Sequence, residues 1–265
     1  MSTHSFESTW DAQAGAGPVS VLDLARMVDR TPLRERPFDH IYMENVFPAG
    51  FYRALQDQLP AATLFHPLYH HDALQPDGSS TRRRLYLYPE ALWRLPRAQR
   101  TIWSRVAAAL CSPALETALK RKFRTALEDR FQQEAERIPL FPVPILLRDR
   151  PGYRIGIHAD APIKAITVQF YLPRDESQAH LGTVFHTTHK ADGTDRPIAM
   201  PFLPATGYAF AVRRKESWHS VPQTAAADGE RRSIILTYYI DRELKLKLQR
   251  RLQRAGIFIG RTPKY

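Results

Sequence analysis

The sequence predicts an α+β fold that is mainly β, in which an antiparallel barrel or sandwich is supported by helices. Three observations lead to this prediction. The chain has 265 residues, of which 43% are hydrophobic and 25% charged, as in a globular protein with one full core. Helical periodicity recurs between residues 48 and 135. Short β-rich runs separated by turn residues fill the part from 142 to 240.

The first part of the chain is predicted to be a leader outside the folded domain. Residues 1–20 are rich in Ser, Gly, Ala and Thr, a composition that cannot fill a hydrophobic core. A short helix is expected at Val21–Arg30, because Pro32 disfavours helical conformation in the residue before it. We therefore assign residues 1–32 to a partly disordered leader and residues 33–265 to a single domain.

A helical layer is predicted between about residues 48 and 135, with one strand before it and one within it. The expected elements are, in chain order, a strand at His40–Tyr42, a helix at Pro48–Leu59, a strand at Arg84–Tyr88, and helices at Ala98–Leu110 and Ala114–Ala135. Ser112 and Pro113 separate the last two helices, because serine is a good N-cap and proline is tolerated in the first helical turn.

The β core is predicted between about residues 142 and 240. Seven short runs rich in β-branched and aromatic residues alternate there with turn residues. They are Pro144–Leu147, Tyr153–His158, Ala165–Leu172, Gly182–His186, Tyr208–Val212, Ser217–Val221 and Arg232–Ile240. Many short strands at modest spacing are typical of an antiparallel barrel or sandwich, on which the helices pack as a second layer.

A basic amphipathic helix is predicted at the C-terminal end of the β core, at residues 241–254. Leu244, Leu248 and Leu252 recur there every four residues, with Lys and Arg among them. The simplest interpretation is a helix that packs its leucines on the domain. The alternative is a basic surface that binds an anionic substrate or a partner.

Charge and cysteine content indicate the cellular context. The net charge is +11, but it is spread along the chain, and it does not by itself indicate a nucleic-acid partner. Cys111 is the only cysteine, so no disulfide can form within the chain. The sequence has neither a membrane-spanning apolar stretch nor the apolar core of a signal peptide, so we expect a cytoplasmic protein without a membrane partner.

One pair of residues fits a metal site. His158 and Asp160 are two positions apart at the end of a predicted strand, where alternate side chains point to the same face. Two histidines and one carboxylate on one face are the ligand set of non-haem iron(II) oxygenases. The spacing alone is weak evidence, because His70 and Asp72 share it. These two residues lie in a polar loop, which we interpret as a surface or lid segment.

Two further motifs follow this pair in order. His219 lies in a Trp-His-x-Val segment, and Arg231 and Ser233 lie in a Gly-x-Arg-x-Ser segment about ten residues later. Together with the pair His158 and Asp160, they make residues 142–240 resemble the prolyl-hydroxylase-like branch of the iron(II)- and 2-oxoglutarate-dependent oxygenases. The resemblance implies a double-stranded β-helix, which is a jelly-roll or cupin-like barrel. It also implies that His158, Asp160 and His219 bind Fe(II).

The co-substrate 2-oxoglutarate is a dianion whose far carboxylate needs a fixed cation. Arginine suits this role because its planar guanidinium can pair with a carboxylate through two hydrogen bonds. Arg231 and Ser233 share one face of their predicted strand, and the resemblance implies that both bind this carboxylate. By the same resemblance Tyr171 donates its hydroxyl to it. Thr167 lies on the face of Tyr171 and is expected to line the same pocket.

The resemblance implies hydroxylation of a substrate, with dioxygen as a second co-substrate and with release of succinate and carbon dioxide. Loops that carry several arginines favour a polar, anionic small molecule, such as an amino-acid, sugar or natural-product intermediate. The main alternative is a protein or peptide side chain, as in prolyl hydroxylation, and a further one is a non-catalytic β-barrel binding module. Nucleic-acid repair is disfavoured, because dioxygenases of that kind carry a second arginine where this chain has Thr237.

Overall fold

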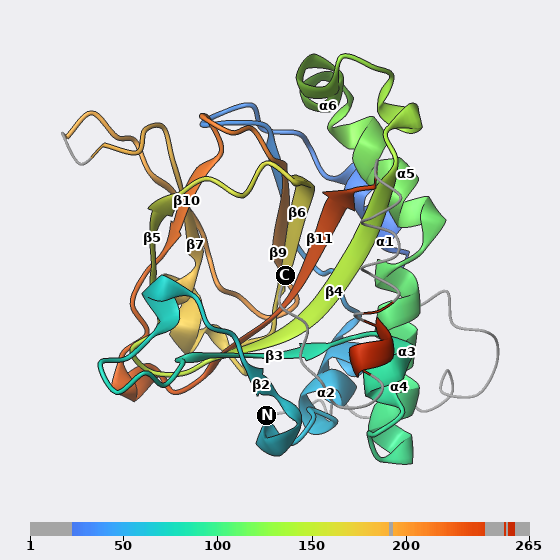
Figure 1. Ribbon diagram of the computed structural model, residues 1–265, viewed down its shortest axis with the longest axis vertical. Coiled ribbons are helices and arrows are strands. Elements are labelled where there is room, and N and C mark those ends of the chain that lie inside the picture. The colour runs from blue at the N-terminus through green and yellow to red at the C-terminus, as the bar shows by residue number, and fades with distance from the viewer. Residues whose placement is uncertain (1–22, 191–192, 242–251, 253, 258–265) are drawn as a thin grey trace, which may run out of the picture.

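The computed structural model describes residues 23–190, 193–241, 252 and 254–257, which form two antiparallel β-sheets and a group of helices. In Figure 1 the larger sheet stands in the middle and the smaller sheet faces it on the left. The larger sheet consists, in spatial order, of β1 (His40–Met43), β9 (Gly207–Ala211), β6 (Lys164–Tyr171), β11 (Arg231–Ile240), β4 (Leu140–Asp149), β3 (Arg82–Tyr86) and β2 (His66–Pro67). The smaller sheet consists of β5 (Ile155–His158), β10 (Trp218–Val221), β7 (Thr183–His186) and β8 (Ile198–Met200).

From β4 onward the chain passes back and forth between the two sheets. Strands β4, β6, β9 and β11 belong to the larger sheet, and β5, β7, β8 and β10 belong to the smaller one. Tyr171 of β6 and Phe185 of β7 lie in one buried cluster, so side chains of the two sheets meet in the interior. The prediction of an α+β fold that is mainly β, with antiparallel strands, is confirmed.

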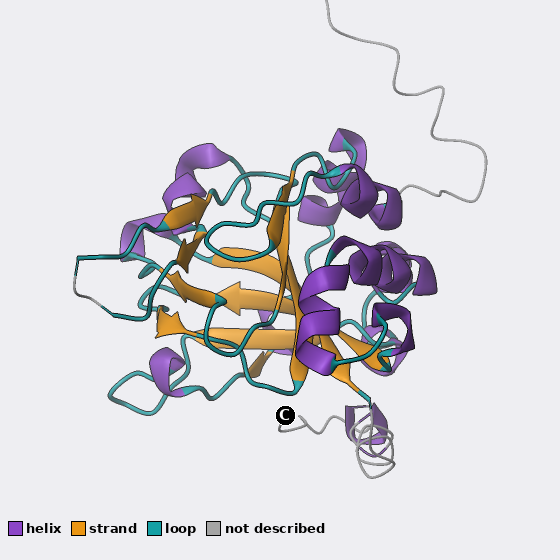
Figure 2. Ribbon diagram, turned by 90° about the horizontal axis from the view of Figure 1, so that it is seen from above, coloured by secondary structure: helices purple, strands orange, loops and turns teal. Residues whose placement is uncertain are grey.

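The α-helices are gathered on one side of the larger sheet, and the helical segments on the other side in Figure 2 are short 3-10 helices. The α-helices are α1 (Leu24–Arg30), α2 (Ala49–Asp57), α3 (Pro89–Leu92), α4 (Arg97–Leu110), α5 (Pro113–Lys122) and α6 (Arg124–Phe131). Ser112 caps α5 as predicted, because its hydroxyl accepts a hydrogen bond from the amide of Leu115. The short elements α3 and β8 have four and three residues and are not predicted from the sequence.

The predicted single helix at Ala114–Ala135 is wrong, because the chain forms two helices there. Helix α5 ends at Lys122 and α6 begins at Arg124, and Phe123 between them has a φ of −106° and a ψ of 25°. The side chain of Phe123 is buried in the main hydrophobic core. We infer that burying this ring stabilises the bend more than an unbroken helix would, since helices in proteins depend mostly on tertiary packing.

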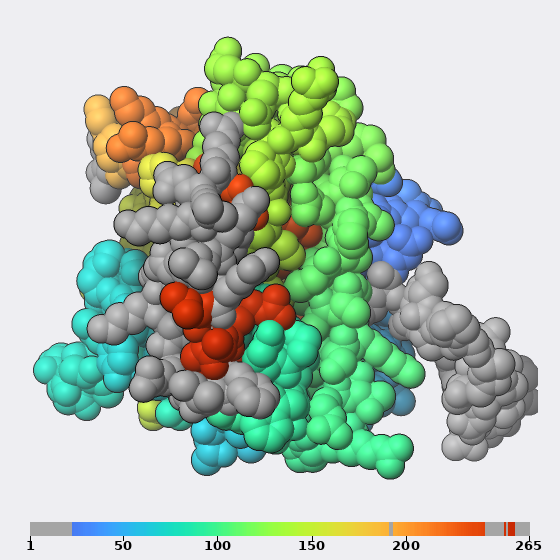
Figure 3. Space-filling view, turned by 45° about the vertical axis from the view of Figure 1, so that its right-hand side comes forward, coloured from blue at the N-terminus to red at the C-terminus, as the bar shows by residue number. Residues whose placement is uncertain are grey.

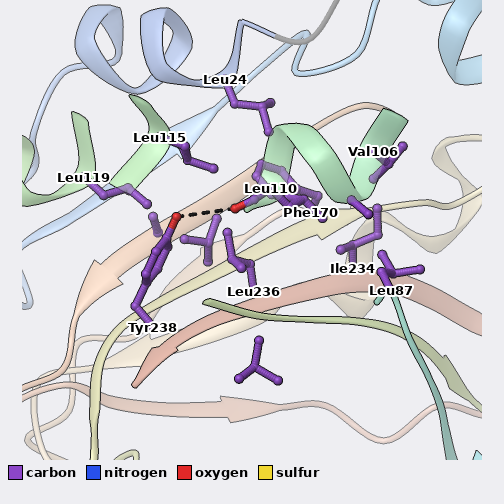
Figure 4. Packing of buried hydrophobic residues seen from close by; sticks show 14 of the residues in the cluster. Leu24, Leu87, Val106, Leu110, Leu115, Leu119, Phe170, Ile234, Leu236 and Tyr238 are labelled. Atoms are coloured by element: carbon purple, nitrogen blue, oxygen red, sulfur yellow. Dashed lines mark hydrogen bonds between the residues drawn. The ribbon is translucent and has the colours of Figure 1, made fainter. Parts of the chain in front are cut away.

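The main hydrophobic core lies between the larger sheet and the helices (Figure 4). Leu236 and Tyr238 of β11 share this core with Leu110 of α4 and Leu115 of α5. The Tyr238 hydroxyl donates a hydrogen bond to the carbonyl oxygen of Leu110 (3.4 Å). Because side chains alternate along a strand, the other residues of β11, Ser233 among them, face the smaller sheet. That face of β11 contributes to the candidate site.

Replacing Leu236 by alanine is expected to lower the free energy of unfolding by about 2–5 kcal/mol, because it removes buried methyl groups and leaves a cavity. Leu236 is fully buried. Urea unfolding followed by circular dichroism measures the loss. The matched control is Leu74→Ala, because Leu74 is exposed and the same truncation there is expected to cost less than about 0.5 kcal/mol. Equal losses in the two variants would contradict this assignment of the core.

Parts of two predictions lie outside the described residues. These parts are residues 1–22 of the predicted leader and most of the predicted basic helix, including Leu244 and Leu248. Of the C-terminal part, residues 254–257 are helical, Arg254 pairs with Glu90 (2.7 Å), and Ile257 is buried. Figure 3 shows this end of the chain in red against the green helical layer. The described end therefore contacts the domain through Arg254 and Ile257. Leu252, which the simpler interpretation expects to pack on the domain, is instead 65% exposed.

No helix in the described part of the chain combines the length and the apolar character needed to cross a membrane.

Candidate metal centre

Strands of the smaller sheet bring the three predicted metal ligands together. His158 ends β5, Asp160 follows two residues later, and His219 lies opposite His158 on the neighbouring strand β10. Each of the three side chains offers one ligand atom, and these atoms all lie within 4.8 Å of one another. The centroids of the two imidazole rings are 4.2 Å apart. Two imidazoles and one carboxylate at this separation can hold one metal ion.

Backbone carbonyl groups orient both histidines in the same way. Nδ1 of His158 lies 3.0 Å from the carbonyl oxygen of Gly156, and Nδ1 of His219 lies 3.0 Å from that of Ser217. A carbonyl oxygen can only accept, so we assign the ring hydrogen to Nδ1 in both residues. The lone pair of each Nε2 is then available for a metal ion, an arrangement that is common for metal-binding histidines.

Asp160 is buried, and polar side chains contact both of its carboxylate oxygens. The Thr167 hydroxyl donates to Oδ2 (2.6 Å), and the Lys164 ammonium donates to Oδ1. Burial alone would raise the pKa of Asp160. The charge of Lys164 and the hydrogen bonds from Lys164 and Thr167 outweigh burial and hold that pKa well below its usual range. Asp160 is therefore ionised at neutral pH.

His219 is neutral at the same pH. Burial lowers the pKa of His219 to about 4, so its imidazole binds no second proton near pH 7. A neutral imidazole beside an ionised carboxylate is the protonation state that metal binding requires. The donor set therefore fits a divalent transition metal.

Arg231, predicted to hold the far carboxylate of 2-oxoglutarate, is fully buried between the sheets. Its Nε donates to the carbonyl oxygen of Leu181 (2.9 Å), and its Nη1 donates to Oδ2 of Asp149 (3.0 Å). The guanidinium carbon lies 4.6 Å from the centre of the Phe202 ring and 5.5 Å from that of Tyr171. Among the described residues, its Nη2 has no hydrogen-bond partner. A buried donor without a partner is costly, so Nη2 is suited to bind a ligand.

Tyr171 and Ser233 lie next to Arg231, and they face each other on β6 and β11. Burial raises the pKa of Tyr171 to about 12, so its hydroxyl keeps its hydrogen while it accepts a hydrogen bond from the amide of Thr183 (3.0 Å). The Ser233 hydroxyl accepts a hydrogen bond from the side-chain amide of Gln169 (2.7 Å). Because neither contact uses the hydroxyl hydrogen, both hydroxyls can still donate to an anion.

Strand β6 connects the metal ligands with the arginine. Thr167 and Tyr171 are four residues apart on one face of β6, which corresponds to about 13 Å along a strand. Thr167 contacts Asp160, and the guanidinium of Arg231 lies over the Tyr171 ring. Thr167, expected to line the co-substrate pocket, lies beside the proposed metal ligand Asp160, so it belongs to the metal end of this face.

Three residues of the site are not predicted from the sequence: Arg82, Asp149 and Lys164. Asp149 is fully buried at the end of β4, where it accepts hydrogen bonds from both Arg82 and Arg231. A carboxylate that follows the apolar run at residues 145–147 is a signal that could have pointed to Asp149. Arg82 gives no such signal, because β3 begins two residues earlier than the predicted strand.

The other histidine groups lie apart from this cluster. His70, His71 and Asp72 also bring one ligand atom each within 4.8 Å, but the side chain of His71 is 80% exposed. His186 belongs to a different set of contacts, since Nδ1 lies 2.5 Å from Asp195 and Nε2 lies 2.7 Å from Ser220. We infer that these two contacts hold Asp195, in the loop after β7, against the smaller sheet.

Comparison with known proteins identifies the fold. No protein-family model matches the sequence, and no curated protein matches it. A solved structure of a prolyl hydroxylase from Trichoplax adhaerens, in complex with a hypoxia inducible factor oxygen degradation domain peptide fragment, matches with a TM-score of 0.53. The match covers 89% of this chain and 94% of that one, at 13% identity. A prolyl-4-hydroxylase from Pseudomonas putida matches with a TM-score of 0.50 and 15% identity, over 83% of this chain and 100% of that one.

The chain has the prolyl hydroxylase fold. The resemblance inferred from the sequence motifs is thus confirmed at the level of the fold. At these identities the likeness concerns the fold alone, and a fold by itself does not determine an activity. The chemistry of this prolyl-hydroxylase-like chain must therefore be argued from its own side chains.

Proposed function

We propose that this chain is a non-haem iron(II)- and 2-oxoglutarate-dependent dioxygenase, built on a double-stranded β-helix formed by β4 to β11. The observation that carries the proposal is the cluster of His158, Asp160 and His219, whose ligand atoms lie within 4.8 Å of one another. This donor set fits Fe(II), which imidazole and carboxylate ligands bind together while leaving other positions open. The alternation of β4 to β11 between the two sheets supports the double-stranded β-helix.

The chain's own residues have separate tasks in this proposal. His158, Asp160 and His219 hold the iron, and Lys164 and Thr167 keep the Asp160 carboxylate ionised and oriented. The bound iron and 2-oxoglutarate supply the oxidising chemistry, with dioxygen as the second co-substrate. Nη2 of Arg231, the Tyr171 hydroxyl and the Ser233 hydroxyl bind the far carboxylate of 2-oxoglutarate. The guanidinium charge is held in an interior from which water is largely excluded, and this strengthens the interaction.

For the substrate we propose a polar small molecule with an anionic group, which the enzyme hydroxylates while succinate and carbon dioxide are released. The arginines in the loops predicted to line the substrate site favour an anionic group. The competing proposal is a peptide side chain, because the Trichoplax adhaerens structure with the same fold holds a peptide fragment. Uncharged, anionic and proline-containing peptide substrates should therefore be screened side by side.

We place the enzyme in the cytoplasm as a single domain of residues 33–265. A lone cysteine and a site suited to Fe(II) are compatible with a reducing compartment. Turnover of 2-oxoglutarate to succinate by the purified protein, with no substrate added, would separate an enzyme from a non-catalytic binding module.

The test of the cofactor site is an anaerobic titration of the protein with iron(II) and then with 2-oxoglutarate. We expect the weak visible absorption of an iron(II) complex of a 2-keto acid to appear in the wild type and to be lost in His158→Ala. Isothermal calorimetry of each addition gives a second, independent readout. If no band and no heat of binding appear at saturating iron, the three residues do not form an iron site, and the binding-module interpretation replaces the enzyme.

A further inference from the structure

We propose that Arg82 is a positioning residue for the co-substrate: it occupies the Asp149 carboxylate and thereby keeps Nη2 of Arg231 available. This inference rests on the proposed function, because it concerns the same 2-oxoglutarate site. Arg82 comes from β3, which precedes the β4 to β11 core in the chain and lies at the opposite side of β4 from β11. Arg82 is not among the residues that the sequence motifs point to.

The register of the larger sheet places three charged residues in one row. Asp149 of β4 is the partner of Arg82 on β3 and also of Arg231 on β11. Directly paired residues in neighbouring strands point to the same face, so all three side chains enter the interior together. The side chains of Asp149 and Arg231 are fully buried, and that of Arg82 is 12% exposed.

The two arginines bind Asp149 in different ways. Arg82 uses two nitrogens, with Nε 2.7 Å from Oδ1 and Nη2 3.2 Å from Oδ2, so it contacts both carboxylate oxygens. Arg231 uses only Nη1, which lies 3.0 Å from Oδ2. Because Arg82 takes the two-nitrogen position on the carboxylate, Asp149 does not pair with Nη2 of Arg231 as well.

Charge leads to the same conclusion. Two guanidinium groups and one carboxylate leave this buried cluster with one positive charge in excess. A buried, unbalanced charge is costly, and a single carboxylate from a ligand would balance it. Aromatic rings hold both guanidinium planes in place: Arg82 lies 4.4 Å from the centre of the Tyr153 ring, and Arg231 lies 4.6 Å from that of Phe202.

The substitution Arg82→Met separates this positioning role from a merely structural one. Without Arg82, Asp149 can pair with two nitrogens of Arg231, which neutralises the guanidinium and competes with the co-substrate carboxylate. We expect the dissociation constant for 2-oxoglutarate to rise roughly 10- to 100-fold, as for the loss of one charged hydrogen bond. The affinity for iron(II) should stay unchanged, because the Arg82 side chain contacts Asp149 and the Tyr153 ring and not the proposed metal ligands.

The experiment is anaerobic calorimetry of the full-length protein, with iron(II) first and 2-oxoglutarate second. The matched control is Arg83→Met, one residue along β3, where the side chain points to the opposite face. That variant should bind both ligands like the wild type. Arg82→Lys should give an intermediate 2-oxoglutarate affinity, because an ammonium group can occupy the Asp149 carboxylate but lacks the fork that covers both oxygens.

Each result has one meaning. If the wild type binds no 2-oxoglutarate, the proposed function itself fails. If the wild type binds it and folded Arg82→Met binds it equally well, the positioning role is overturned. A parallel loss of iron(II) and 2-oxoglutarate affinity would also overturn it, because that indicates general loss of structure. If Arg82→Met does not fold, Arg82→Lys decides, and an unchanged 2-oxoglutarate affinity in that variant would overturn the inference.

Discussion

Replacing His219 by alanine is expected to abolish iron(II) binding and leave the fold intact. His219 supplies one of the three clustered ligand atoms, so its removal leaves one histidine and one carboxylate. Loss of a residue that only supports a metal ligand costs about 10- to 100-fold in affinity, and loss of a ligand itself should cost more than about 100-fold. Metal content after anaerobic loading and gel filtration, together with the calorimetric affinity, measures the effect.

The fold should survive this substitution because few contacts depend on the His219 side chain. Its Nδ1 donates to the backbone carbonyl of Ser217, two residues earlier, and its ring lies 5.0 Å from that of Phe210. The matched control is His189→Ala, since His189 is exposed and its ring contacts Trp218 rather than the proposed metal ligands. We expect the control to bind iron(II) normally. Normal iron(II) binding by His219→Ala would mean that the metal is held elsewhere.

Replacing Arg231 by alanine is expected to raise the concentration of 2-oxoglutarate needed for half-saturation by about 100-fold, since the variant loses the charged hydrogen bond from Nη2, worth up to about 3 kcal/mol. The buried guanidinium provides the Nη2 donor and the excess positive charge of the site. The protein should still fold, because Arg82 remains to balance the buried Asp149. Iron(II) affinity should change little, so the ratio of the two dissociation constants is the informative quantity.

The neighbouring Arg232 is the matched control for this substitution. Its side chain alternates to the other face of β11 and pairs with Glu230 (3.3 Å) at the surface. Arg232→Ala should therefore leave the 2-oxoglutarate requirement unchanged. If Arg232→Ala raises it and Arg231→Ala does not, the register of β11 is off by one residue, because a one-residue shift exchanges the two faces of a strand.

Local patterns in the chain are enough for several features of this protein. The two-residue period of β11 separates Arg231 and Ser233 from Ile234 and Leu236 without any knowledge of the neighbouring strands. The same period puts His158 and Asp160 on one side of the chain. These predictions succeed because the alternation of side chains along a strand is a property of the backbone itself.

Other features depend on which segments become neighbours. Arg82 and Asp149 are 67 residues apart, and Asp149 and Arg231 are 82 residues apart, yet the register of three strands puts them in one row.

The sequence by itself therefore determines the types of the proposed ligands, their spacing and the strand face on which each lies. The faces follow from the local geometry of the backbone. The partners of Asp149 and the break at Phe123 become visible only in the folded molecule. These features depend on strand pairing and on competition for buried space, which are set by contacts between distant parts of the chain.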